Sequence, residues 1–179
     1  EEYANYKPSE KERLDLSEFA DASKFAYESK PMRKNLELFM KIQQDVIKRM
    51  ESDGSRLILL TARSDLNCKK TVLEFMNGLG FDTKLVHIER AGQLGEGPSG
   101  PRKAMILSGY IHRNNFGSVV MFDDSQSNLT HMASVAKNSD DLQYASVLVK
   151  EDGAMEIVDR SQYLDRAGIF AKNVTVPID

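Results

Sequence analysis

The chain alternates between segments in which apolar residues recur at helical spacing and short, continuous apolar runs. A first helix is predicted after Pro31, because proline is common in the first turn of a helix, and Asp53-Gly54 is expected to end it. Its apolar positions recur every three or four residues, at Leu36, Phe39, Ile42, Val46 and Met50.

Four continuous apolar runs predict β-strands, at Leu57–Leu60, Leu85–Ile88, Val119–Phe122 and Ala145–Val149. The first of them is expected to be covered on both faces. Segments with helical spacing separate the runs, and a glycine-rich loop from Gly92 to Gly100 precedes the helix that Pro101 opens. Strands that alternate with helices predict an α/β fold with a mostly parallel central sheet.

The chain divides into three parts by composition. Residues 1–30 are polar and mixed in charge, and we expect an N-terminal arm or cap segment there. Residues 31–158 hold the alternating pattern and form the predicted core. Residues 159–179 form a C-terminal extension, for which we expect a short helix near Arg160–Arg166 and a strand at Asn173–Ile178.

Composition narrows the class of protein. The 179 residues, 41% of them hydrophobic and 28% charged, fit one globular domain, and the formal net charge of −3 gives no basic footprint for nucleic acid. The single cysteine, Cys68, excludes a disulfide framework and suits a reducing compartment, so we expect a cytoplasmic protein. No apolar stretch reaches the roughly 20 residues that span a bilayer. The chain begins at Glu1 without an initiator Met, so we expect this terminus to result either from processing or from the design of the expressed sequence.

Polar groups follow two of the predicted strands at the point where each strand ends. Thr61, Ala62 and Arg63 follow the first run, and Asp123 and Asp124 follow the third. Parallel strands present their carboxyl ends at one edge of the sheet, where open α/β folds bind ligands. That edge would hold a hydroxyl, a guanidinium and two carboxylates, which suits a phosphate and a divalent cation together.

Each of these positions has a chemical role and a plainer alternative. Asp123 and Asp124 fit Mg²⁺, which is held by one or two carboxylates, phosphate oxygens and waters, although Asp124 or Ser125 could simply cap the next helix. Thr61 and Arg63 suit the binding of a phosphoryl group. The alternative is a threonine turn that leads into a helix, with Arg63 at the surface.

Lys103 is the third candidate position. It lies at the start of the helix after the glycine-rich loop, where a lysine can neutralise phosphate charge in a transition state. The alternative is a solvated lysine.

Taken together, these motifs resemble the haloacid dehalogenase (HAD) superfamily of phosphohydrolases over about Pro31 to Val149. The segment 57–63 resembles the second motif of the family, Lys103 the third and the segment 119–124 the fourth. The resemblance implies a Rossmann-like, three-layer fold. It also implies Mg²⁺ bound by Asp123 and Asp124, phosphoryl binding by Thr61, Ala62 and Arg63, and catalytic roles for Thr61 and Lys103. The segments 57–63, 86–92 and 122–129 resemble HAD-type proteins encoded by tailed bacteriophages.

The chain departs from the family at its first motif, Asp-x-Asp-x-Thr after an apolar strand. The nearest candidate, Asp15, follows no apolar strand, so the nucleophile role is not carried to it. We expect the attacking aspartate upstream of Glu1. In the family, the strand of this motif lies between those that end at Thr61 and Asp123, so another segment must fill that place. The chain's own Asn173–Ile178 is an alternative, although Pro177 is awkward in a central strand.

Three functions follow as hypotheses. The first is a Mg²⁺-dependent phosphohydrolase of the HAD type, of which this chain is the larger part. The second is an inactive HAD-fold structural or binding module, for example a processed bacteriophage virion protein, which would place it in the host cytoplasm or the virion. The third is a phosphatase acting on nucleic-acid ends. The expected partners are a phosphorylated small molecule or a nucleic-acid end, and its own cleaved N-terminal segment or another protein chain, with no membrane.

Overall fold

The computed structural model describes residues 30, 31, 33–63, 69–95 and 97–161. The expectations for residues 1–29, including Asp15, and for the segment 162–179 lie outside these residues. The elements run in the order α2 (Arg33–Asp53), β1 (Leu57–Thr61), α3 (Lys69–Gly78), β2 (Val86–Arg90), a 3-10 helix η2 (Ala91–Leu94), α4 (Ser99–Arg113), β3 (Ser118–Asp123), α5 (Gln126–Lys137), β4 (Gln143–Val149) and β5 (Met155–Arg160). No described helix is long and apolar enough to cross a membrane.

The helices and strands confirm the alternating pattern, with bounds that shift by one to three residues. Helix α4 begins two residues before Pro101, and β2 extends to Arg90. Gly54, which is predicted to end the first helix, follows α2 with a φ of +74°, and Gly80 follows α3 with a φ of +95°, a conformation that favours glycine.

Strand β5 occupies the first position of the short helix expected near Arg160–Arg166, and the rest of that segment, from residue 162, lies outside the described residues. Arg160 ends a strand that pairs antiparallel with β4, opposite Ala145. A tight turn joins the two strands. In it the Gly153 amide donates to the Lys150 carbonyl at 2.8 Å, and Gly153 has a φ of +81°. Asp152-Gly153 is a known hairpin signal, and it was missed because acidic residues interrupt the apolar positions of the strand that follows.

The described strands form two sheets. Strands β1 and β2 pair in parallel, β3 and β4 pair in parallel, and β5 adds to β4 antiparallel. The molecule is therefore a mixed α/β structure with small parallel and mixed sheets. The expected single central sheet is absent from the described residues, because none of them forms a strand that joins β1 to β3.

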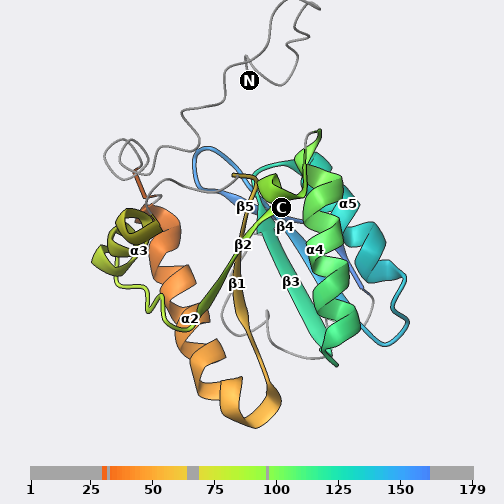
Figure 1. Cartoon of the computed structure of the whole chain (residues 1–179), viewed down its shortest axis with the longest axis horizontal. Coiled ribbons are helices and arrows are strands. Elements are labelled where there is room, and N and C mark those ends of the chain that lie inside the picture. The colour runs from red at the N-terminus through yellow and green to blue at the C-terminus, as the bar shows by residue number, and fades with distance from the viewer. Residues whose placement is uncertain (1–29, 32, 64–68, 96, 162–179) are drawn as a thin grey trace, which may run out of the picture.

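Helices nevertheless cover both faces of β3 (Figure 1). On one face, Met121 joins a buried cluster with Ala104 of α4 and Leu129 and Met132 of α5, and Leu60 of β1 packs against it. On the other face, the rings of Phe122 and Phe39 of α2 meet edge to face, with centroids 5.2 Å apart. Successive strand residues point to opposite faces, so the continuous apolar run suits this double cover.

The cover over β1 is less complete than predicted. Leu59 is 39% exposed, and Ile88, its partner across the β1–β2 pair, is 36% exposed. The prediction that Leu57–Leu60 is covered on both faces is therefore wrong at Leu59.

Tyr110 joins α4 to β2 and gives the fold a titratable contact. Its hydroxyl donates to Glu89 Oε1 at 2.5 Å. Burial, followed by the hydrogen bond to the Glu89 carboxylate, raises the pKa of Tyr110 to about 12.

We expect the free energy of unfolding of Tyr110→Phe to fall less steeply with rising alkaline pH than that of the wild type. The folded state holds the Tyr110 proton to a pKa of about 12, and the unfolded state releases it near 10. The stabilisation is therefore fully present below pH 10 and is lost as the pH rises through about 12. Urea unfolding at intervals from pH 8 to about 12 measures the slope. Equal slopes for the wild type and Tyr110→Phe would contradict the assignment.

Candidate functional site

The ends of β1 and β3 point to the end of the molecule where α4 begins (Figure 1). Thr61 is the last residue of β1, and Asp123 is the last residue of β3. Helix α4 starts at this end and packs against α5 and η2. The sequence predicts Thr61 and Asp123 at one edge of a single sheet. The structure has them at the same end of the molecule, but among the described residues they end two different sheets.

Lys103 and Asp123 form a buried ion pair. Lys103 Nζ lies 2.5 Å from Asp123 Oδ2, and the two side chains are 8% and 5% exposed. The alternative of a solvated lysine is therefore wrong. Transferring two charges from water into the interior costs free energy. The ion pair therefore stabilises the fold only if further hydrogen bonds satisfy the remaining donors and acceptors of the two groups.

Two further donors bind the Asp123 carboxylate. Its Oδ1 accepts hydrogen bonds from the backbone amide of Ser125 at 2.9 Å and from Asn128 Nδ2 at 3.0 Å. The Ser125 hydroxyl in turn accepts from the Asn128 amide at 3.3 Å and caps α5. The capping alternative is thus correct for Ser125, and it coexists with the ion pair of Asp123. Asp124 is exposed beside this network.

Asn128 also ties the beginning of α4 to α5. The Ser99 hydroxyl donates to Asn128 Oδ1 at 2.8 Å. Next to it, Gly100 lies so close to His131 that a Cβ at residue 100 would come within 2.5 Å of the imidazole ring. The first turn of α4, which carries Lys103, is thereby held against Asp123.

Arg102 fixes the glycine-rich loop that leads into α4. Its Nη1 donates to the carbonyl of Gly95 at 2.5 Å, its Nη2 to that of Gly97 at 2.8 Å, and its Nε to that of Pro98 at 3.3 Å. Gly95 and Gly97 have φ of +111° and +109°, which side chains rarely tolerate. The guanidinium thus joins three backbone carbonyls on the N-terminal side of α4.

The end of β1 is a tight turn tied to η2. The Thr61 hydroxyl oxygen accepts from the Arg63 amide at 3.2 Å, and the Arg63 carbonyl accepts from the Gly92 amide at 3.2 Å. Arg102 Nη1 lies 3.5 Å from the Gly92 carbonyl. Thr61 and Arg63 are therefore linked through η2 to α4 and Lys103, while Ala62 is exposed.

On their own, Asp123 and Asp124 at the end of β3 supply only some of the ligands that Mg²⁺ needs. A carboxylate offers about four lone-pair positions, and three donors already use Asp123. One position on Oδ2 is left, and the exposed Asp124 adds a second carboxylate. The described residues hold no group of three or more side chains of the kind that bind metals.

Ser99, Arg102 and Asn128 were missed by reasoning from sequence. Ser125 and Asn128 have the three-residue spacing of a helix cap, which was a usable signal for α5. The contacts of Ser99 and Arg102 depend on how α4 packs against α5 and η2. No local sequence pattern predicts this packing.

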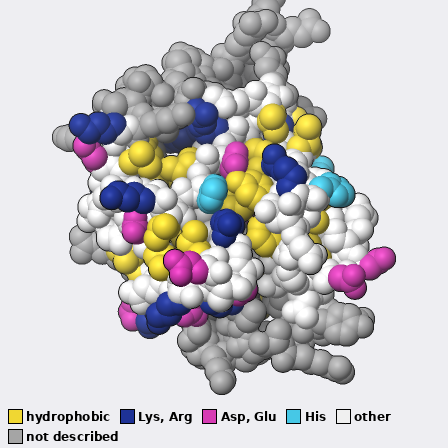
Figure 2. Space-filling model, turned by 60° about the horizontal axis from the view of Figure 1, so that its bottom comes forward, with side chains coloured by type: hydrophobic (Ala, Val, Ile, Leu, Met, Phe, Trp, Pro, Cys, Tyr) yellow, Lys and Arg dark blue, Asp and Glu magenta, His cyan; other side chains and the backbone are white. Residues whose placement is uncertain are grey.

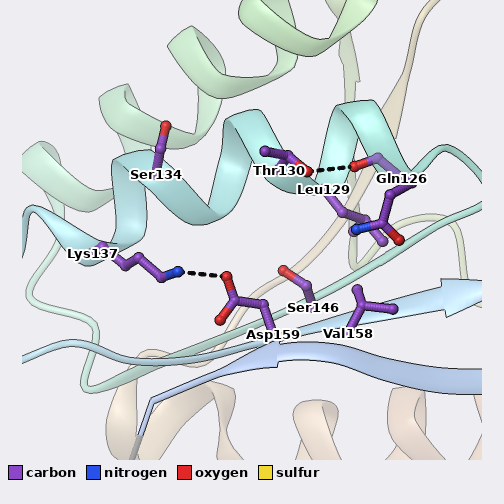
Figure 3. A pocket seen from close by; sticks show the side chains of 8 residues that line it. All are labelled: Gln126, Leu129, Thr130, Ser134, Lys137, Ser146, Val158 and Asp159. Atoms are coloured by element: carbon purple, nitrogen blue, oxygen red, sulfur yellow. Dashed lines mark hydrogen bonds and ion pairs between the residues drawn. The ribbon is translucent and has the colours of Figure 1, made fainter.

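A second hollow lies between α5 and the β4–β5 hairpin, away from the strand ends, with a volume of about 180 Å³ (Figure 3). Lys137 and Asp159 pair at its rim at 2.6 Å, and the hydroxyl of the fully buried Ser146 has no hydrogen-bond partner. Its lining contains none of the predicted site residues, so the strand ends remain the candidate site.

No family model matches the chain, and no curated protein or solved structure matches it.

We expect Lys103→Met to destabilise the fold by about 3 kcal/mol, because it leaves the Asp123 carboxylate buried without its counter-ion. Lys137→Met is the matched control, since its pair with Asp159 is half exposed, at 52% and 31%, and should contribute less than about 1 kcal/mol. Urea unfolding at pH 7 measures both variants. Equal losses would contradict a structural role for the buried pair.

Proposed function

We propose that the chain is a Mg²⁺-dependent phosphohydrolase of the HAD type, or the larger part of one, with a Rossmann-like core. The observation that carries the proposal is the buried pair of Lys103 and Asp123 at the end of β3, held beside the loop that anchors Thr61. A lysine held by an aspartate at the carboxyl edge of a parallel strand pair is placed to neutralise an anion there.

The Thr61 turn supports phosphoryl binding. The hydrogen bond from the Arg63 amide uses the Thr61 hydroxyl as an acceptor, so its own hydrogen can be donated to a phosphoryl oxygen. Arg63 and the exposed Ala62 amide lie in the same turn, and turn amides of this kind bind anions.

Lys103 and the acidic residues have complementary roles in the proposal. Asp123 holds the ammonium of Lys103, so Lys103 can orient an attacking carboxylate and offset phosphate charge without reorganisation. Asp123 and Asp124 would hold Mg²⁺, which neutralises charge on the phosphoryl oxygens when it is bound.

The reaction needs a nucleophile that the described residues do not contain. We propose an aspartate on a strand from upstream of Glu1. Its carboxylate oxygen forms a bond to phosphorus while the ester P–O bond breaks, and the second aspartate of the Asp-x-Asp motif gives its proton to the leaving alcohol and regains one from the water that attacks next. Water then attacks phosphorus, the phosphoaspartyl bond breaks, and phosphate is released. The substrate class is a phosphorylated small molecule or a nucleic-acid end.

We expect residues 1–179 alone to be inactive on p-nitrophenyl phosphate with Mg²⁺, and activity to appear when an upstream segment with the Asp-x-Asp motif is restored. In the active form, Asp124→Asn should raise the Mg²⁺ concentration for half-maximal rate about tenfold. Asp141→Asn is the control, because Asp141 is exposed in a turn away from the strand ends. Turnover by residues 1–179 that disappears in Asp15→Asn would overturn the assignment of the nucleophile.

A second candidate is a catalytically inactive binding module, for example a processed bacteriophage virion protein. Among the described residues, β1 and β3 each pair along one edge only, which favours this candidate because a free edge presents backbone groups to another strand. Intact-mass measurement of the natural protein distinguishes the two. A product that starts at Glu1 inside a particle supports the module, and one that starts upstream with Asp-x-Asp supports the enzyme.

A further inference from the structure

The hollow between α5 and the β4–β5 hairpin has a buried floor and an exposed mouth (Figure 3). Leu129 and Ser146, at its floor, are fully buried. The mouth is surrounded by exposed side chains of α5, which are those of Gln126, Thr130, Ser134 and Lys137. The volume of about 180 Å³ is enough for a small ring, because an engineered apolar cavity of ~150 Å³ in another protein binds benzene.

The Ser146 hydroxyl is a buried polar group without a hydrogen-bond partner among the described residues. Ser146 lies on β4 between Tyr144 and Leu148, which both pack on the side of the strand that α5 covers. Strand residues two apart point to the same face, so Ser146 points into the space below α5, as Figure 3 shows. A buried hydroxyl is nearly always hydrogen-bonded, so this one calls for a partner inside the hollow.

A β-bulge in β5 shapes the wall of the hollow beside Ser146. The pairing of β4 with β5 shifts register there, and Val158 is the extra residue. In a regular strand Val158 and Asp159 would point to opposite faces. Here Val158 packs against the cluster that contains Leu129, and Asp159 pairs with Lys137 of α5 at 2.6 Å. The bulge therefore places an apolar and an acidic side chain next to each other on one wall.

The small size of Ser146 leaves space that a larger residue would fill. Its neighbours on the same face of β4, Tyr144 and Leu148, are large, and Leu129 and Val158 line the space beside it. Protein interiors are close-packed, and unfilled space next to apolar side chains lowers stability. A valine at this position would fill the space and leave no unpaired hydroxyl, so a ligand explains the serine better than packing does.

The charges around the mouth favour a neutral ligand. Lys137 and Asp159 neutralise each other, and the Tyr144 hydroxyl donates to the second carboxylate oxygen of Asp159 at 3.2 Å. An ionic ligand would have to break this pair or remain without a counter-ion. The described surface in Figure 2 likewise mixes side chains of both signs, without a large patch of one sign that would attract an ion.

We propose that the hollow binds a neutral, phenol-like molecule, about the size of a six-membered ring, whose one oxygen forms a hydrogen bond with Ser146. The ring packs against Leu129 and Val158. A sugar fits less well, because its many hydroxyls would face these two side chains without partners. The hollow contains neither Thr61 nor Asp123, so the inference goes beyond the proposed phosphohydrolase and does not depend on it.

Phenol and benzene are the probes for the test, because they differ by one hydroxyl. Methyl NMR of residues 1–179 follows Leu129 and Val158 in the hollow and, as a distant reference, Val72 of α3 (Figure 1). Phenol should shift the Leu129 and Val158 signals saturably, with a dissociation constant of about 1 mM or below, and leave Val72 unchanged. Benzene should bind about fivefold more weakly, because it leaves the Ser146 hydroxyl unpaired.

Ser146→Ala and Ser134→Ala form a matched pair of a floor serine and a rim serine. The Ser134 hydroxyl already donates to the His131 carbonyl at 2.8 Å. Ser146→Ala should weaken phenol binding about fivefold and remove the preference for phenol over benzene, and Ser134→Ala should bind both probes like the wild type. Ser146→Val, which fills the hollow, should abolish the saturable shifts. Circular dichroism checks that it folds, and Ser146→Ala decides the question if it does not.

Three results would overturn the inference. The absence of saturable shifts at millimolar phenol would mean that water alone fills the hollow. An unchanged preference for phenol in Ser146→Ala, or equal weakening by Ser134→Ala, would mean that Ser146 does not contact the ligand. Shifts of Val72 as large as those of Leu129 would mean non-specific binding. The titrations contain no Mg²⁺ and no phosphate ester, so their failure is distinguishable from failure of the phosphatase assay.

Discussion

The buried ion pair between Lys103 and Asp123 is the constraint on which the rest of this end of the molecule depends. Two charges in the interior require a complete set of partners, and the chain supplies them from three elements. The Ser125 amide and the Asn128 side chain donate to the Asp123 carboxylate. The Ser99 hydroxyl in turn donates to Asn128 Oδ1. The beginnings of α4 and α5 are positioned by the same carboxylate that ends β3.

This arrangement shows how one carboxylate can serve both the fold and a site. Asp123 has most of its acceptor capacity committed to protein donors, so it acts mainly as an anchor that holds the Lys103 ammonium at the end of β3. The exposed Asp124 has the freedom that Asp123 lacks. The adjacent acidic residues are thus unequal, one buried in a network and one facing solvent.

Sequence reasoning predicted the elements well and their assembly less well. The apolar runs predicted β1 to β4 because a buried strand must be apolar along its length, and strand-end chemistry singled out Thr61, Lys103 and Asp123. Strand β5 was missed because Glu156 and Asp159 interrupt its apolar positions. The roles of Asn128 and Arg102 come from contacts between elements, which local periodicity does not encode. Hydrophobic periodicity also does not predict the division into two sheets, because tertiary structure decides which strands pair.

The inward edges of β1 and β3 also bear on how the protein behaves at high concentration. Rows of unpaired backbone amides and carbonyls on flat, apolar strands are templates for edge-to-edge growth, which natural sheets suppress with proline, inward charge or bulges. Neither β1 nor β3 carries a proline, and β1 carries no charge. Among the described residues, β1 and β3 each leave one such edge without a partner, so association between chains at these edges is expected to grow with protein concentration.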